Sequence, residues 1–153
     1  MNKITYKKEL LEFAIQKQQS FIDDFKKRIK DMQDGEEMVN DGEYDIADRA
    51  INDNTNRMIN KLADQLAFAN KEMATLIDLL REENLHTIVD LGSIVVTDIK
   101  TFFVSVSLEK LIYDGQDIIG ISVDSPLYQK MKGKRKGQLF SYNESHYFIK
   151  EVY

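Results

Sequence analysis

The sequence of 153 residues predicts an α+β protein, in which a long antiparallel coiled-coil hairpin precedes a small sheet domain with one short helix. Two apolar stripes with helical spacing fill the first half, and short β-favouring runs fill the second half. Between the two stripes, residues 34–48 contain seven acids and no base. We therefore assign residues 1–84 to the hairpin, with an acidic tip at about residues 34–45, and residues 85–153 to a globular domain.

The first predicted helix covers residues 5–34. Its inward positions recur at alternating spacings of four and three, which places them on one stripe of a helix. The stripe consists of Leu11, Ile15, Gln18, Ile22, Phe25, Ile29 and Met32. Gln18 is the one polar residue of this set, so the stripe predicts a narrow apolar seam with a single polar interruption.

The second predicted helix covers residues 43–83 and has a similar stripe. Its members are Ile51, Thr55, Met58, Leu62, Leu66, Ala69, Met73, Leu76 and Leu80. Two successive spacings of four, from Met58 through Leu62 to Leu66, predict a stutter in the heptad.

The turn between the helices is predicted at the acidic tip, bracketed by Gly35 and Gly42. At a rise of 1.5 Å per residue, the shorter arm spans roughly 45 Å. An arm of this length buries only a narrow seam, which is typical of a rod that reaches a partner.

The second half of the chain changes to short runs of β-branched and aromatic residues, bounded by glycine and aspartate. The predicted strands are residues 94–96, 102–106, 118–121, 139–142 and 147–149. Ser125 as N-cap, Pro126 at the first helical position and Gly133 beyond the end predict the one short helix.

Composition excludes several classes of protein and site. Cysteine is absent, which excludes disulfides and thiolate metal sites, and His86 and His146 lack the spacing of a zinc site. No apolar run approaches the ~20 residues that span a bilayer, and no signal-peptide core is present, so we expect a cytoplasmic protein. The net charge of -5 argues against naked nucleic acid as the main partner.

Residues 121–127 read Ile-Ser-Val-Asp-Ser-Pro-Leu, and residues 131–134 and Gly137 follow them. This segment is similar to the C-terminal domain of bacterial Gre transcript-cleavage factors, whose pattern is an Ile-Ser-x-x-Ser-Pro entry to a short helix and a Leu-x-Gly-Lys exit. The closing residues 149–153 also resemble the final strand of that family. Gre factors begin with a coiled-coil hairpin, so the resemblance covers nearly the whole chain.

The resemblance implies an FK506-binding-protein-like fold for the sheet domain and RNA polymerase as the partner. The globular domain would dock on the rim of the secondary channel, through Asp124, Ser125, Pro126 and Leu127, while the hairpin enters the channel. The tip acids would reach the active site, meet the nascent RNA 3′ end indirectly and stimulate cleavage of backtracked RNA. The resemblance thus implies an accessory factor rather than an enzyme, monomeric without polymerase and without a membrane partner.

At the tip, Gre factors carry Gly-Asp-x-x-Glu-Asn-x-Glu-Tyr, in which the aspartate and the first glutamate are the functional acids. Alignment on Glu43 and Tyr44 places Glu37 at the aspartate and Asn40 at that glutamate, with Asp41 one residue further along. The resemblance therefore implies Glu37, Asn40 and Asp41 as the catalytic tip. Glu37 and Asp41 would be ligands of a Mg²⁺ shared with the polymerase, and the chain would need no cofactor of its own.

The change at Asn40 bears on the chemistry of cleavage. Two-metal hydrolysis requires the factor to retain the second Mg²⁺ and orient the attacking water. Mg²⁺ prefers hard oxygen ligands, and residues three apart on a helix share a face. An amide supplies no charge and is not a general base at neutral pH. The alternative is therefore a Gre-like secondary-channel modulator or inhibitor without cleavage activity.

The tip acids also have a purely structural interpretation. Asn40 and Glu43 resemble a capping pair for the second helix, and Glu43 and Asp45 suit the positive end of its dipole. Capping accounts less well for Glu36, Glu37 and Asp41 together, which favours a functional tip.

Three further alternatives remain open. The basic run of Lys130, Lys132, Lys134, Arg135 and Lys136 is either a solvated turn or a contact with an acidic patch on a partner. Fold analogy alone suggests a prolyl isomerase or chaperone. A coiled-coil interaction module would instead predict a stable homodimer.

Overall fold

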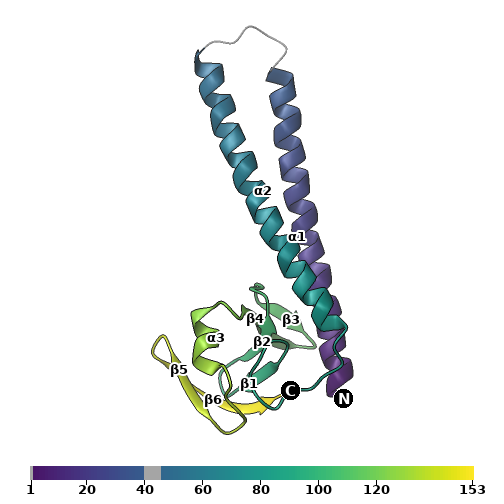
Figure 1. Cartoon of the computed structure of the whole chain (residues 1–153), viewed down its shortest axis with the longest axis vertical. Helices are drawn as coiled ribbons and strands as arrows, with labels where there is room; N and C mark the ends of the chain where they lie inside the picture. The colour runs from purple at the N-terminus through teal and green to yellow at the C-terminus, as the bar shows by residue number, and fades with distance from the viewer. Residues whose placement is uncertain (1, 40–45) are drawn as a thin grey trace. The chain divides into compact units, whose positions relative to one another are not determined.

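The computed structural model describes residues 2–39 and 46–153, and the side chains of residues 2–35 and 50–153. It contains two long helices, α1 (Lys3–Val39) and α2 (Ile46–Leu80), then a six-stranded sheet and the short helix α3 (Pro126–Met131) (Figure 1). The strands are β1 (Ile94–Thr97), β2 (Thr101–Ser105), β3 (Leu111–Tyr113), β4 (Gln116–Ser122), β5 (Leu139–Tyr142) and β6 (Ser145–Val152). The predicted α+β class, with a helical hairpin before the sheet, is confirmed.

Helix α1 continues beyond its predicted end at residue 34. It passes through Gly35 and ends at Val39. A glycine inside a helix costs about 1 kcal/mol relative to alanine, which weakens the helix without ending it. Among the described residues, no helix combines the length and apolarity needed to cross a membrane.

The chain packs as two compact units. The first consists of Met1–Ile15 and Ala74–Tyr153, and the second consists of Gln16–Met73. The first unit contains the sheet with the beginning of α1 and the end of α2, and the second unit contains the remaining parts of both helices. The predicted domains of residues 1–84 and 85–153 divide the chain by sequence and stay a prediction.

In the second unit, the seam along α1 is the predicted one. Gln18 and Ile22 are buried, and Phe25, Ile29 and Met32 are half-buried. The other described side chains of α1 from residue 16 to residue 35 are exposed, apart from these five. The stripe read from the sequence is therefore the surface that α1 buries.

The seam along α2 differs from the prediction at its beginning. Ile51 and Met58 are 60% and 54% exposed, whereas Ile59 is half-buried. The buried and half-buried apolar and threonine positions are Thr55, Ile59, Leu62, Leu66, Ala69 and Met73. Their spacings alternate between four and three without a break, so the predicted stutter is wrong. Met58 and Ile59 are both apolar, and the unbroken heptad selects Ile59.

The first unit is built on a mixed sheet with the strand order β3-β4-β2-β1-β6-β5. Strands β2 and β4 are parallel, and the other neighbouring pairs are antiparallel. The sequence did not predict β3, which has three residues and buries Leu111 against β4. A run this short has no readable alternation.

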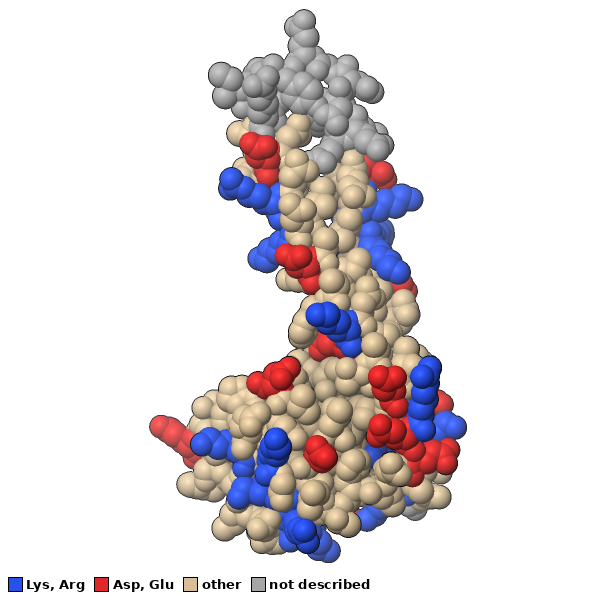
Figure 2. Space-filling model, viewed as in Figure 1, with Lys and Arg blue, Asp and Glu red and all other residues tan. Residues whose placement is uncertain are grey.

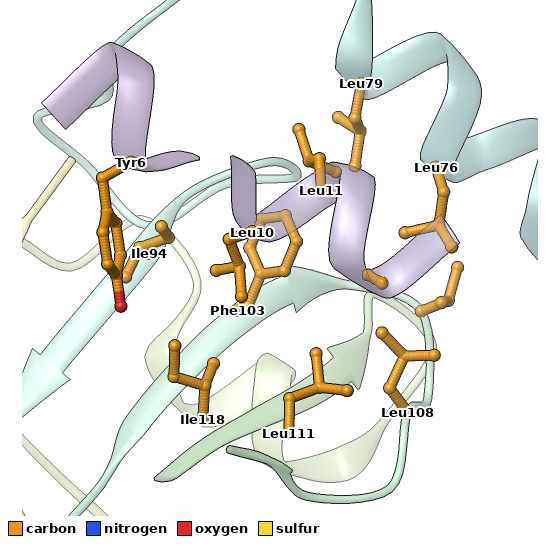
Figure 3. Packing of buried hydrophobic residues seen from close by; sticks show 12 residues of the cluster. Tyr6, Leu10, Leu11, Leu76, Leu79, Ile94, Phe103, Leu108, Leu111 and Ile118 are labelled. Atoms are coloured by element: carbon orange, nitrogen blue, oxygen red, sulfur yellow. The ribbon is translucent and has the colours of Figure 1, made fainter. Parts of the chain in front are cut away.

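Within the first unit, both faces of the sheet are buried at β1, β2 and β4. On one face, side chains of β1, β2 and β4 such as Ile94, Phe103 and Ile118 pack against Leu10 of α1 and Leu76 of α2 (Figure 3). On the other face, the core consists of Val89, Val95, Phe102, Val104, Ile121, Tyr128, Met131, Phe140, Tyr147 and Ile149. Successive residues of a strand point to opposite faces. Phe102 and Phe103 therefore belong to different cores, and both are buried because both faces of the sheet are covered there.

Candidate functional site

The predicted catalytic tip falls mostly outside the described residues. Glu37 lies in the last turn of α1, and the structure describes its backbone but not its side chain. Asn40 and Asp41 lie outside the described residues. Their convergence on one metal ion stays a prediction.

The predicted partner-binding segment, Asp124 to Leu127, lies at the start of α3. Ser125 is the N-cap, with φ -73° and ψ 145°, and its Oγ accepts a hydrogen bond of 3.2 Å from the backbone N–H of Tyr128. Pro126 occupies the first turn, where its missing N–H leaves no bond unmade. The helix start that the sequence predicted is confirmed in its capping as well as its position.

The same segment offers two kinds of exposed group. The side chains of Asp124 and Pro126 are exposed, whereas Leu127 is half-buried and packs on the core. The backbone N–H of Asp124 donates to Ser122 Oγ over 3.1 Å, which fixes the approach to the helix. The arrangement presents a carboxylate beside a rigid ring, and the predicted contact of this segment with a partner stays a prediction.

Tyr128 fixes the start of α3 to the rest of the first unit. Its side chain is buried, and its hydroxyl donates to Asp90 Oδ1 over 3.4 Å. Burial raises the pKa of Tyr128, and the negative charge of Asp90 raises it further. The phenol therefore stays neutral and keeps donating, so α3 is anchored on the side opposite to Pro126.

No group of three or more His, Asp or Glu side chains that could hold a metal ion occurs among the described residues. The predicted ligands Glu37 and Asp41 are not among the described side chains. The suitability of the tip for Mg²⁺ thus rests on the chemistry of its donors, which are carboxylate and amide oxygens.

Sequence reasoning missed a buried lysine, Lys7, in the first unit. The residue is 5% exposed, and its Nζ donates a hydrogen bond of 2.9 Å to the backbone oxygen of Asn84. Burial lowers its pKa to about 8, and the nearby Glu82 opposes part of that change. Lys7 precedes Leu10, Leu11 and Ala14 by three, four and seven residues, so the helical period could have placed it on the buried face.

The beginning of α1 is also tied to the last strand by aromatic and charged groups. Lys3 forms an ion pair with Glu151, and its Nζ lies 5.1 Å from the ring centroid of Tyr153. Tyr6 packs against Tyr153 with ring centroids 6.4 Å apart. Burial, the largest cause, raises the pKa of Tyr153 to about 12. These contacts join residues near the two ends of the chain and have a structural role.

No protein-family model matches this chain, and no curated protein sequence matches it significantly. Among solved structures, GreA factor homolog 1 (Gfh1) of Thermus thermophilus is similar over 95% of this chain and 94% of its own, with 16% identity and a TM-score of 0.35. Gfh1 of Thermus aquaticus is similar over 99% of this chain and 96% of its own, with 17% identity and a TM-score of 0.34.

Proposed function

We propose that this protein is a transcription elongation factor that binds RNA polymerase at the secondary channel and stimulates cleavage of backtracked RNA. The observation that carries the proposal is a two-helix hairpin whose arms lead into the acidic tip. Helix α1 ends at Val39 and α2 begins at Ile46, and the seven acids of residues 34–48 lie at and between these ends.

The construction of the hairpin supports insertion into a narrow space. In the second unit, α1 buries a stripe one residue wide and exposes its other described side chains from residue 16 to residue 35. The part of α1 in the second unit runs from Gln16 to Val39, and these 24 residues at 1.5 Å per residue give a length of about 36 Å. A two-helix rod of this length has too little core to be a folding scaffold, and it suits a probe that carries its end to a distant site.

The chemistry of the tip supports a role in cleavage. Glu37 and Asp41 would hold a Mg²⁺ shared with the polymerase, since this ion binds carboxylate oxygens and keeps several waters. A bound Mg²⁺ lowers the pKa of its water and stabilises charge on phosphate oxygens. The protein would be an accessory factor, because the polymerase supplies the RNA and the remaining metal ligands.

The segment before α3 supports docking. The resemblance to Gre factors in residues 121–137 includes the Ser-Pro entry, and Ser125 makes the capping bond that this entry requires. In the proposal, Asp124, Pro126 and Leu127 contact the rim of the channel.

The test is RNA cleavage in a stalled, backtracked elongation complex, with polymerase from the same organism and Mg²⁺ present. We expect the protein to accelerate cleavage, and we expect Glu37→Ala and Asp41→Ala to lower that acceleration at least about tenfold without weakening polymerase binding. Asp31→Ala is the matched control, because Asp31 is an exposed acid on α1 outside the seam. Absence of polymerase binding would overturn the proposal.

A second candidate is a secondary-channel modulator without cleavage activity, and Asn40 favours it. The amide stands where Gre factors have an acid and supplies neither a charge nor a general base. Polymerase binding with slowed elongation and no cleavage would select this candidate. Asn40→Glu should then introduce cleavage, and Asn40→Gln should not.

A further inference from the structure

The β5–β6 hairpin leaves one backbone edge of the sheet open. Its strands are joined by a two-residue turn with φ values of 48° and 65°, so Tyr142 and Ser145 flank the turn as a hydrogen-bonded pair. Bonded and non-bonded pairs alternate along an antiparallel ladder. The backbone N–H and C=O groups of Leu139 and Ser141 therefore point away from β6. Strand β5 is the last strand of the sheet, so these groups face outward.

The outer face of the same hairpin is apolar at its centre. Leu139 and Phe148 are opposite each other in the register and are 65% and 41% exposed. Ser141 and His146 form the next pair on this face, with Oγ and Nδ1 2.7 Å apart, and Lys150 follows Phe148. The alternate residues of both strands are buried in the core. The hairpin thus has one face committed to the fold and one face available for contact.

This region is basic although the whole chain has a net charge of -5. Residues 128–150 contain six bases and one acid. The bases are Lys130, Lys132, Lys134, Arg135, Lys136 and Lys150. Lys134 is half-buried and the other five are exposed. Figure 2 shows Lys and Arg side chains gathered over the part of the sheet domain where α3 and β5 lie in Figure 1.

We propose that the edge of β5 and this outer face bind an acidic, extended segment of a protein partner, which adds to the sheet as a further strand. Backbone groups of the segment would pair with Leu139 and Ser141, as in strand addition to other exposed sheet edges. Apolar side chains at alternate positions would rest on Leu139 and Phe148, and acidic side chains would meet the surrounding bases. The inference stands independently of the proposed function.

The pattern favours a protein strand over a nucleic acid. The phosphates of a nucleic acid could pair with the Lys and Arg side chains. A nucleic acid has no alternating N–H and C=O groups that could pair with the edge of β5. The free edge and the apolar pair are both explained by a strand.

The test uses an acetylated, amidated ten-residue peptide of alternating glutamate and valine, added to the full ¹⁵N-labelled chain. We expect saturable shifts of amide signals in β5, and amide hydrogen exchange at Leu139 and Ser141 slowed at least about tenfold. A peptide of alternating lysine and valine should produce neither effect. Binding of the acidic peptide without protection of these two amides would overturn the proposal.

Substitutions at Ser141 test the contribution of the backbone edge to binding, and substitutions of two lysines test the contribution of the positive charge. Ser141→Pro removes an outward N–H while leaving the bonds between β5 and β6, and Ser141→Thr is the matched control that keeps it. We expect Ser141→Pro to weaken peptide binding at least about tenfold and Ser141→Thr to have little effect. The double variant Lys132→Glu and Lys136→Glu changes exposed residues and should weaken binding by a similar factor at low salt.

A polyuridine RNA of ten nucleotides tests the alternative that the basic surface binds nucleic acid. We expect no protection of Leu139 and Ser141 by this RNA. Binding of the RNA with no binding of the acidic peptide would overturn the proposal and assign the basic surface to nucleic acid.

Discussion

The side-chain amide of Gln18 donates a hydrogen bond of 2.9 Å to the backbone oxygen of Ala69, inside the buried seam of the hairpin. Gln18 is 3% exposed and Ala69 is 5% exposed. The same Nε2 lies 3.5 Å from Glu72 Oε1. A buried amide is tolerated where it is bonded, and a single polar residue in an apolar seam fixes which residues face each other. The bond between Gln18 and Ala69 therefore sets the alignment of the two helices in the second unit.

We expect Gln18→Ala to destabilise the hairpin by roughly 1–2 kcal/mol, because it removes a buried hydrogen bond and part of the packing. Amide hydrogen exchange of residues 62–73 measures the effect locally. Gln19→Ala is the control, since Gln19 is exposed and bonds to Asp23 on the surface of the same helix, and it should change stability by less than about 0.5 kcal/mol. Equal effects of the two variants would contradict the role of Gln18 in the seam.

The register of α2 predicts opposite outcomes for two neighbouring residues. Ile59→Ala should destabilise the hairpin by roughly 1–2 kcal/mol because Ile59 is half-buried in the seam. Met58→Ala should be close to neutral because Met58 is 54% exposed. Amide exchange of the flanking α2 residues compares the two variants. A larger effect at Met58 would restore the stutter that the sequence suggested.

These two residues also show what limited the sequence-based prediction of the fold. The apolar stripe of α1 was read correctly because Phe25, Ile29 and Met32 each have polar residues on both sides, which leaves one possible register. Along α2, Met58 and Ile59 are adjacent and equally apolar, so the pattern alone did not select between them. At Phe102 and Phe103, two adjacent apolar residues are both buried. A strand covered on both faces lacks the alternation of apolar and polar residues that marks a half-exposed strand.

In the candidate site, features set by local bonds could be predicted from the sequence, and features set by distant residues could not. The start of α3 could be predicted because Ser125 and Pro126 act on their own helix through local bonds. Lys7 and Asn84 are 77 residues apart in the chain, and no local pattern predicts a bond between them. The outward edge of β5 likewise depends on the order of the strands in the sheet, which the sequence analysis did not predict.

The close approach at Gly120 predicts a large effect of a single methyl group. An added Cβ would lie 2.7 Å from Leu108 Cβ and 2.8 Å from the backbone oxygen of Val106. Gly120→Ala should therefore destabilise the first unit by roughly 1–3 kcal/mol, measured by urea unfolding. Gly35→Ala is the matched control, because nothing lies within 4 Å of its added Cβ and Gly35 is inside α1. This variant should stabilise α1 by about 0.5–1 kcal/mol. If Gly120→Ala left the free energy of unfolding unchanged, the close packing of β4 against Val106 and Leu108 would be contradicted.

The buried amino group of Lys7 predicts that stability rises with pH in the mildly alkaline range. The pKa of Lys7 is lowered from 10.5 to about 8 in the folded protein, chiefly by burial. Between these values the unfolded chain binds a proton that the folded chain has released, so the free energy of unfolding increases as pH rises through this window. From about pH 7.5 to about pH 9.5 the gain from this group should be roughly 1–2 kcal/mol. Above pH 10 the trend should reverse, because the pKa of Tyr153 is raised from 10.0 to about 12 and the unfolded chain then loses protons first.

The measurement is urea unfolding at a series of pH values, comparing the protein with Lys7→Met and Lys8→Met. Lys7→Met keeps an unbranched side chain of similar length without the amino group, so its unfolding free energy should lose the rise between pH 8 and pH 10, the interval bounded by the pKa of about 8 of Lys7 and the ordinary tyrosine value of 10.0. Lys8 is the exposed neighbour on the same helix, and Lys8→Met should keep the rise. If Lys7→Met and the unsubstituted protein followed the same pH profile, the amino group would be charged and solvated in the folded state.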